Sequence, residues 1–180
     1  MTSETIELVE RVRRRLNESE RTCEITGPVP EAAIAAAEEA LGVTFPPSYR
    51  TFLQTFGGIA IPTHLGVVHQ FVGVAPPSPE QAGAPGLPGL PGLQDDVVRR
   101  TLAARVERNL ADHLVVVAMG AEFQEWFCLD ASRPKPNGEY PVLLYDARDN
   151  AVDQQFYDDF GQMLEEVMGF VADNLEQPLD

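Results

Sequence analysis

The stretch of sequence that decides the fold is residues 38–58, which read EEALGVTFPPSYRTFLQTFGG. Before it, Pro30 suits the first turn of a helix, and Gly42 suits a left-handed helix end. A pair of prolines at 46–47 then interrupts the chain, and a glycine pair at 57–58 closes the stretch. Between these breaks, four residues follow the i, i+3, i+4, i+7 spacing of an amphipathic helix: Tyr49, Phe52, Leu53 and Phe56. The stretch therefore predicts the end of one helix and the whole of a second.

The flanking segments carry both helical and strand patterns. Apolar residues at helical spacing from about Glu4 to Arg21 predict an N-terminal helix, which Thr2 or Ser3 can cap. The residues from Ile59 to Val74 are mostly apolar and β-branched, which favours two short strands. We expect the sheet to begin there.

The second half of the chain predicts a helix, a run of strands and a final helix. Asp95-Asp96 can cap a helix whose buried stripe is expected to be Val98, Leu102, Val106 and Leu110. Strands are expected at 114–119, 123–129 and 140–145, with an edge strand at 152–156 and a helix from 160 to 175. Consecutive strands with short turns pair antiparallel. The predicted fold class is therefore α+β, a single antiparallel sheet of about four to six strands packed against a layer of helices.

Residues 75–92 differ from the rest in composition, because glycine and proline recur there in four Gly-x-x triplets. The run is too short for a collagen triple helix. We interpret it as a surface insertion loop, and the alternative that its leucines contact a partner stays open. The whole chain, 1–180, is expected to form one domain with its core at about 30–175.

The charge of the chain bears on the partners it can take. Its formal net charge is −15, which repels both phosphate backbones and anionic lipid surfaces. We therefore expect neither nucleic acid nor membrane as a partner. The start of the chain lacks the layout of a signal peptide, and the two distant cysteines, Cys23 and Cys128, are interpreted as buried free thiols. These features together favour the cytoplasm.

Residues that could support catalysis are few and scattered. His64, His69 and His113 have no recognisable ligand spacing, and no Cys-x-x-Cys pair or nucleophile elbow is present. Gly57-Gly58 is not followed by the Lys-Ser/Thr of a phosphate-binding loop. We therefore expect no enzyme activity, no metal and no cofactor.

The C-terminal part of the chain carries the strongest charge asymmetry. From Asp146 onward there are ten acidic residues against Arg148 alone. A solvated helix face explains part of this bias, and a docking surface for a basic partner is the other interpretation. Trp126 could anchor such a surface or belong to the core. The candidate partner-binding residues are Glu122, Glu125, Trp126, Asp130, Asp146, Asp149, Asp153, Asp158 and Asp159.

The stretch at 38–58 resembles the opening signature of the SUKH superfamily, which includes the yeast cell-wall-synthesis regulator group. The pattern is a helix end, a proline, a Tyr-x-x-Phe-Leu helix and a Gly-Gly stop. Residues 115–118 and 126–130 resemble the family's central hairpin, 141–146 its next strand, and Phe160 with Leu164 its last helix. The signature residues here are Leu41, Gly42, Pro46, Tyr49, Phe52, Leu53, Gly57 and Gly58.

The resemblance implies a non-enzymatic α+β domain, whose bacterial members commonly serve as immunity proteins. Such proteins bind and neutralise a specific toxin, often a nuclease. A nuclease must be basic to hold phosphates, so an acidic inhibitor can complement its charge. The sequence therefore favours a cytosolic immunity protein that binds a cognate toxin or another basic protein. The alternative is an intracellular scaffold or regulatory interaction domain, and the oligomeric state is left open.

Overall fold

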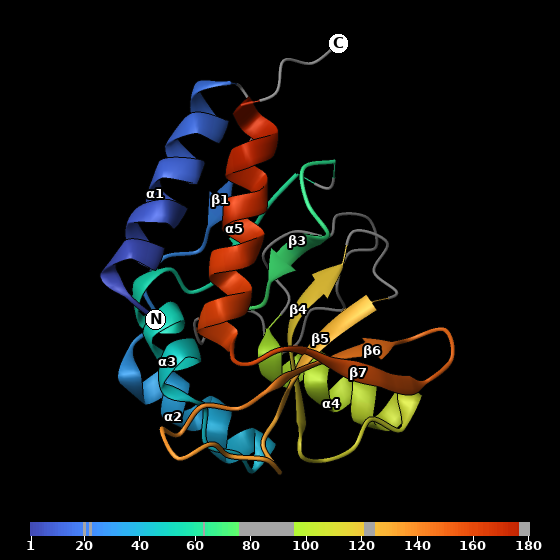
Figure 1. The fold of residues 1–180 in the computed structure, drawn as a ribbon. Coiled ribbons are helices and arrows are strands. Elements are labelled where there is room, and N and C mark those ends of the chain that lie inside the picture. The colour runs from blue at the N-terminus through green and yellow to red at the C-terminus, as the bar shows by residue number, and fades with distance from the viewer. Residues whose placement is uncertain (20, 22, 63, 76–95, 121–124, 177–180) are drawn as a thin grey trace, which may run out of the picture.

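The structure is a computed structural model that describes the chain except for residues 20, 22, 63, 76–95, 121–124 and 177–180. Helices are interspersed with short strands along the N-terminal half, and a run of four strands precedes the last helix (Figure 1). The described elements are α1 (Ser3–Glu18), β1 (Glu24–Ile25), α2 (Glu31–Leu41), α3 (Pro47–Thr55), β2 (Ile59–Ala60), β3 (Val68–Phe71), α4 (Val97–Arg108), β4 (Leu114–Gly120), β5 (Glu125–Asp130), β6 (Val142–Asp146), β7 (Ala151–Tyr157) and α5 (Phe160–Glu176).

All the strands belong to one antiparallel sheet, in which they lie in chain order from β1 to β7. The predicted α+β class with a single antiparallel sheet is confirmed. Within the described residues the sheet has seven strands, which exceeds the predicted four to six. The unpredicted strand is β1, whose two residues are too few to show an alternating pattern. Most of the proposed insertion loop at 75–92 lies outside the described residues.

The two helices predicted around residues 38–58 are present. Gly42 ends α2 with a positive φ of 69°, as a left-handed helix end requires. Pro46 occupies the N-cap position of α3 without a side-chain capping hydrogen bond, and Pro47 is the first residue of the helix. Gly57 follows α3 at φ 76°, where a side chain would collide with the Gly27 carbonyl. Glycine is therefore needed at this position for both conformation and space.

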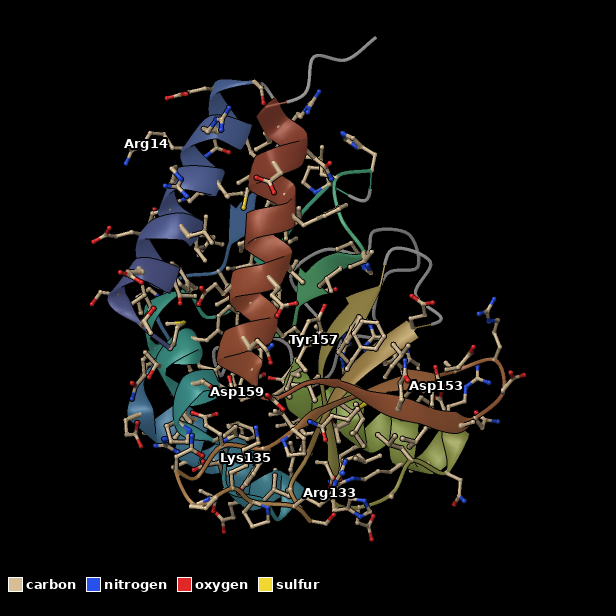
Figure 2. All side chains as sticks on the ribbon, in the orientation of Figure 1. Arg14, Arg133, Lys135, Asp153, Tyr157 and Asp159 are labelled. Carbon is tan, nitrogen blue, oxygen red and sulfur yellow. The ribbon has the colours of Figure 1, made fainter. Side chains whose placement is uncertain are left out.

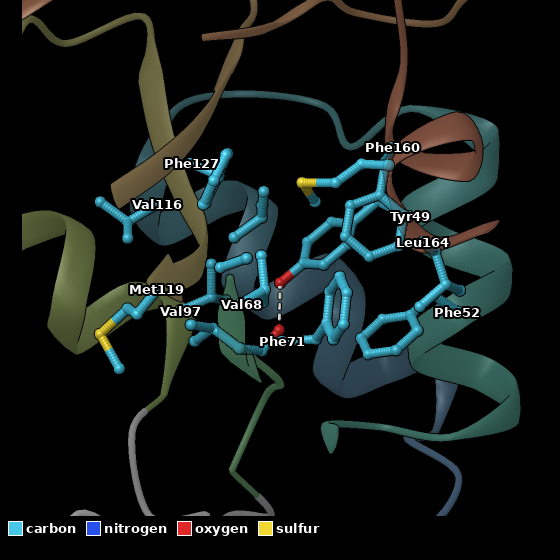
Figure 3. Close-up of a cluster of buried hydrophobic side chains, with 14 of the residues drawn as sticks. Tyr49, Phe52, Val68, Phe71, Val97, Val116, Met119, Phe127, Phe160 and Leu164 are labelled. Atoms are coloured by element: carbon cyan, nitrogen blue, oxygen red, sulfur yellow. Dashed lines mark hydrogen bonds between the residues drawn. The ribbon is translucent and has the colours of Figure 1, made fainter. Parts of the chain in front are cut away.

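The core is built around aromatic side chains from three elements (Figure 3). The ring of Tyr49 in α3 lies 4.9 Å from that of Phe160 in α5, and the ring of Phe52 lies 5.0 Å from the same ring. Phe71 of β3 completes the cluster, 6.0 Å from Phe160. The buried Tyr49 hydroxyl donates a 2.8 Å hydrogen bond to the Val72 carbonyl. The signature helix α3 is thereby attached to both the sheet and the C-terminal helix.

The strand register separates the two faces of the sheet. Phe71, Ala118 and Phe127 are cross-strand neighbours, so they share the face that α5 covers. Trp126 pairs with Tyr145 on the other face, where the Tyr145 hydroxyl donates to the Arg108 carbonyl at the end of α4. The predicted layer of helices is formed by α1, α3 and α5, and α4 lies across the sheet from them (Figures 1 and 3).

The buried stripe predicted for α4 is wrong at Leu102 and Val106, whereas Leu110, just past the helix, is buried and Val98 is partly buried. Leu102 is exposed and Val106 is 86% exposed, whereas Val97, Thr101 and Ala104 face the core. The small side chains on this face let α4 lie close to β4, where the Thr101 hydroxyl accepts a hydrogen bond from the Val116 N–H. This contact lies beside a register shift between Val116 and Ala118. The prediction assumed that the large apolar side chains of α4 are buried, whereas the buried face of the helix carries smaller ones.

Candidate functional site

The last strand, β7, forms an exposed edge of the sheet. It pairs with β6 on one side, and no strand pairs with its other side in the part of the chain that the structure describes. Its first six residues are exposed, and only Tyr157 is buried. We call this strand the β7 edge. An exposed strand edge leaves backbone N–H and C=O groups available to a partner.

The hairpin that joins β6 to β7 carries three of the predicted carboxylates. Asp146 is paired with Arg148 at 3.1 Å, and hydrogen bonds from Arg148 lower the pKa of this carboxyl. Asp149 and Asp153 are exposed. These two carboxylates are therefore placed at the surface, where a partner can reach them.

A hollow of about 400 Å³ lies where the N-termini of α1 and α5 meet. Both helices start at the same end of the molecule (Figure 1). Four carboxylate side chains line the hollow together with Thr2, Thr5 and Gln162: Glu139, Asp159, Glu165 and Glu166. Asp159 accepts a hydrogen bond from the Gln162 N–H in the first turn of α5. The carboxylates thus gather where the positive ends of two helix dipoles favour negative charge.

The β7 edge and the hollow adjoin one another at Asp158. Its carboxylate accepts a 3.1 Å hydrogen bond from Gln155 on β7 and lies 3.6 Å from the Lys135 amine. Burial, together with the nearby Glu166 carboxylate, raises the pKa of Tyr157 at the end of β7. Figure 2 shows Tyr157, Asp159 and Lys135 in one region, with Asp153 further along β7. We call the following six residues the acidic strip: Asp149, Asp153, Asp158, Asp159, Glu165 and Glu166.

Two of the predicted partner-binding residues are largely buried. Trp126 is 8% exposed, and its ring stacks on that of Tyr145 at 5.5 Å beneath α4. Asp130 is 4% exposed and accepts hydrogen bonds from Ser132 and Arg133. Burial acts to raise the pKa of Asp130, but these hydrogen bonds outweigh it and lower the pKa. Both side chains therefore offer little surface to a partner.

Of the other two candidates, only Glu125, the first residue of β5, is described. Glu125 is exposed and pairs in register with Asp146 across β5 and β6. Glu122 lies outside the described residues. The structure thus brings together Asp149, Asp153, Asp158 and Asp159 along one edge, with Asp146 and Glu125 beside it.

Sequence reasoning missed three of the four carboxylates that line the hollow, since only Asp159 had been selected. Glu165 and Glu166 contributed to the C-terminal charge bias but were not selected as site residues. Glu139 was not considered, because it comes from the loop before β6 and reaches the hollow only through the fold. Its buried carboxylate accepts hydrogen bonds from the Ser48 N–H at 2.9 Å and the Ser48 hydroxyl at 2.6 Å. Glu139 thus caps α3.

The described residues contain no group of three or more His, Cys, Asp or Glu side chains arranged to hold a metal ion. Both cysteines are buried free thiols, as predicted. Burial raises the pKa of Cys23 to about 11, and burial also raises that of Cys128. Thiols with such high pKa values are protonated at neutral pH and are poor nucleophiles. Among the described helices, none has the length and hydrophobicity to cross a membrane.

Comparison with family models gives a match. The family model described as SMI1 / KNR4 family (SUKH-1) matches residues 28–166. This range begins just before α2 and ends within α5, so it includes the signature helices, the sheet from β2 to β7 and all six residues of the acidic strip. No curated protein matches the chain.

Proposed function

The chain belongs to the SMI1 / KNR4 family (SUKH-1), and from this membership we propose that it is an immunity protein that neutralises a cognate toxin by binding it. The proposed complex is stoichiometric and involves no catalysis by this chain. The proposed place of action is the cytoplasm, where such a toxin would arrive or be made.

The observation that carries the proposal is the acidic strip. Its carboxylates lie in the β6–β7 turn, on β7, between β7 and α5 and in the first two turns of α5, and only Asp158 among them has an ion pair with a described basic residue, Lys135. A toxin that cleaves nucleic acid needs a basic surface to hold phosphates, and such a surface complements the strip. Carboxylates that meet Arg and Lys side chains form charge-assisted hydrogen bonds, which are stronger than neutral ones. The proposed partner is therefore a basic, nuclease-type toxin.

The charge also argues against competing partners. With a net charge of −15, the chain gains nothing from the electrostatic attraction that draws proteins to nucleic acids or to anionic membranes. The same charge increases the rate at which a basic protein encounters it. We propose a protein partner, and neither nucleic acid nor membrane.

The experiment that tests this function is co-expression with the toxic domain encoded beside the gene for this chain. We expect the toxic domain alone to stop growth and co-expression of this chain to restore it. The two proteins should also elute together, in equimolar amounts, from a sizing column. A chain with alanine in place of Tyr49 serves as a control, because loss of this core side chain should remove protection by unfolding the protein.

The contrary result would be a neighbouring gene that encodes no toxic domain, or growth that stays arrested although folded chain is present. Weak binding to several unrelated proteins would then favour the scaffold or regulatory alternative. The dissociation constants distinguish a single tight complex, which should be nanomolar, from several weak ones, which should be micromolar. Each tenfold change in dissociation constant corresponds to about 1.4 kcal/mol of binding free energy.

A further inference from the structure

The β7 edge lacks three of the features that protect the edge of a sheet. Proteins commonly protect an edge with proline, with lysine or with a very short strand. β7 has seven residues, Ala151–Tyr157, and contains neither proline nor lysine. Its outer side has no pairing strand among the described residues. The edge therefore presents unpaired backbone groups over the length of an ordinary strand.

The β7 edge also exposes an apolar side chain on each face of the sheet. Val152 is 47% exposed and pairs with Tyr145, so it lies on the face that α4 covers. Phe156 is 45% exposed and packs against Phe127 at 5.9 Å, on the face that α5 covers. A strand added at the edge continues both faces and contacts both side chains. A helix laid on one face would reach only one of them.

Charge decides what kind of strand the edge accepts. Asp149, Asp153 and Asp158 lie along or beside β7, so a second copy paired there would bring like charges together, which destabilises a strand pair. A strand that carries basic side chains avoids this repulsion, because its charges are opposite to those of the carboxylates. The edge thus disfavours a second copy and favours a basic segment.

We propose that the partner docks by adding an extended segment to the β7 edge, and that this segment alternates basic and apolar side chains. The inference rests on the proposed function, because it specifies how the toxin meets the acidic strip. Backbone hydrogen bonds supply the pairing, and the side chains at alternate positions supply selectivity. Lysine or arginine reaches Asp149 and Asp153, and an apolar side chain packs on Val152.

The test uses a capped eight-residue peptide of alternating lysine and valine, added to the intact, isotope-labelled protein. We expect the peptide to slow amide hydrogen exchange within β7 and to shift the β7 signals in the nuclear magnetic resonance spectrum. The same peptide with N-methyl groups on alternate backbone amides keeps its side chains but loses half its donors. This second peptide should leave β7 exchange unchanged.

Charge variants test the chemistry of the segment. Asp149→Asn with Asp153→Asn should weaken peptide binding by roughly threefold to tenfold at low salt, the range measured for a few exposed ion pairs. Asp173→Asn with Glu24→Gln removes the same charge from exposed positions on α5 and on the opposite edge strand, β1, and should leave binding unchanged.

Three outcomes would overturn the inference: no protection of β7 at millimolar peptide, protection at another element, or equal binding of the N-methylated peptide. The two proposals fail separately. If the peptide does not dock at β7 but co-expression still protects cells, the docking mode is wrong and toxin neutralisation stands. If cells are not protected, the toxin proposal is wrong. Peptide docking at β7 would then show that the edge binds a basic partner other than a toxin.

Discussion

At the scale of single residues, the structure divides the acidic side chains into two groups. Glu139 and Asp130 are buried and accept hydrogen bonds from nearby donors, so their charges stabilise the fold. Asp149, Asp153, Glu165 and Glu166 are exposed. Sequence cannot separate the groups, because the donors for Glu139 come from Ser48, which is distant in the chain. Asp130 differs, since its donors follow within three residues and form a recognisable local turn.

Replacement of Glu139 by alanine should lower the free energy of unfolding by about 1 to 3 kcal/mol, because it leaves the buried Ser48 N–H and hydroxyl without their acceptor. Urea denaturation followed by circular dichroism measures this difference. Asp173→Ala, at an exposed position, should change stability by less than about 0.5 kcal/mol. Equal effects of the two substitutions would show that Glu139 is not the cap of α3.

Replacement of Asp130 by asparagine should cost stability at neutral pH and less in acid. The pKa of Asp130 is below its usual 3.8, so the folded protein binds this proton less tightly than the unfolded chain. The stabilisation is therefore present above pH 3.8 and is lost as pH falls through the lower, folded-state pKa. Unfolding curves at neutral and acidic pH should show a gap between wild type and variant that narrows in acid. A gap that widens in acid would contradict this assignment.

The buried thiols should resist modification while the protein is folded. With a pKa of about 11, the Cys23 thiol has about one molecule in a thousand ionised at pH 8. Ellman's reagent at pH 8 should therefore label neither cysteine in the folded protein and both in urea. Rapid labelling without denaturant would mean that the thiols are accessible.

At the scale of elements, the accuracy of sequence reasoning depended on how local the signals were. The α2 and α3 boundaries follow from glycines and prolines, which act through their own backbones, and the prediction holds. The buried face of α4 was predicted wrongly, because Thr101 and Ala104 are selected by close packing on β4. The predictability of the candidate site also depends on whether its residues are near one another in sequence. The β6–β7 hairpin acids are contiguous in sequence, whereas the hollow requires α1, α5 and the Glu139 loop to meet.

The corrected orientation of α4 predicts a large loss of stability for substitution at one position on the helix and almost none at another. Thr101→Val keeps the shape but removes the acceptor of the buried Val116 N–H, which should cost about 1 to 3 kcal/mol. Val106→Thr changes an exposed side chain and should alter stability by less than about 0.5 kcal/mol. Chemical denaturation of both variants gives the comparison. A larger loss at Val106 would support the stripe predicted from sequence and contradict the structure.

At the scale of the whole molecule, the charge is distributed unevenly. The family signature and the core hold α3 against the start of α5, which directly follows β7 in the chain. The acidic strip therefore depends on the same contacts that define the family fold. A surface of one sign of charge increases the association rate with an oppositely charged partner, and salt screens this effect.

The most direct test of the central claim is the association rate between this chain and the toxic domain, measured by stopped-flow at about 20 mM and about 200 mM salt. A strip variant carries Asp149→Asn, Asp153→Asn, Glu165→Gln and Glu166→Gln. A control variant loses the same charge at exposed sites elsewhere: Glu18→Gln, Glu24→Gln, Glu39→Gln and Asp173→Asn. We predict that the strip variant associates roughly tenfold more slowly at low salt, and the control variant within about twofold of wild type. Equal rates for the two variants would contradict the claim that the acidic strip is the binding surface.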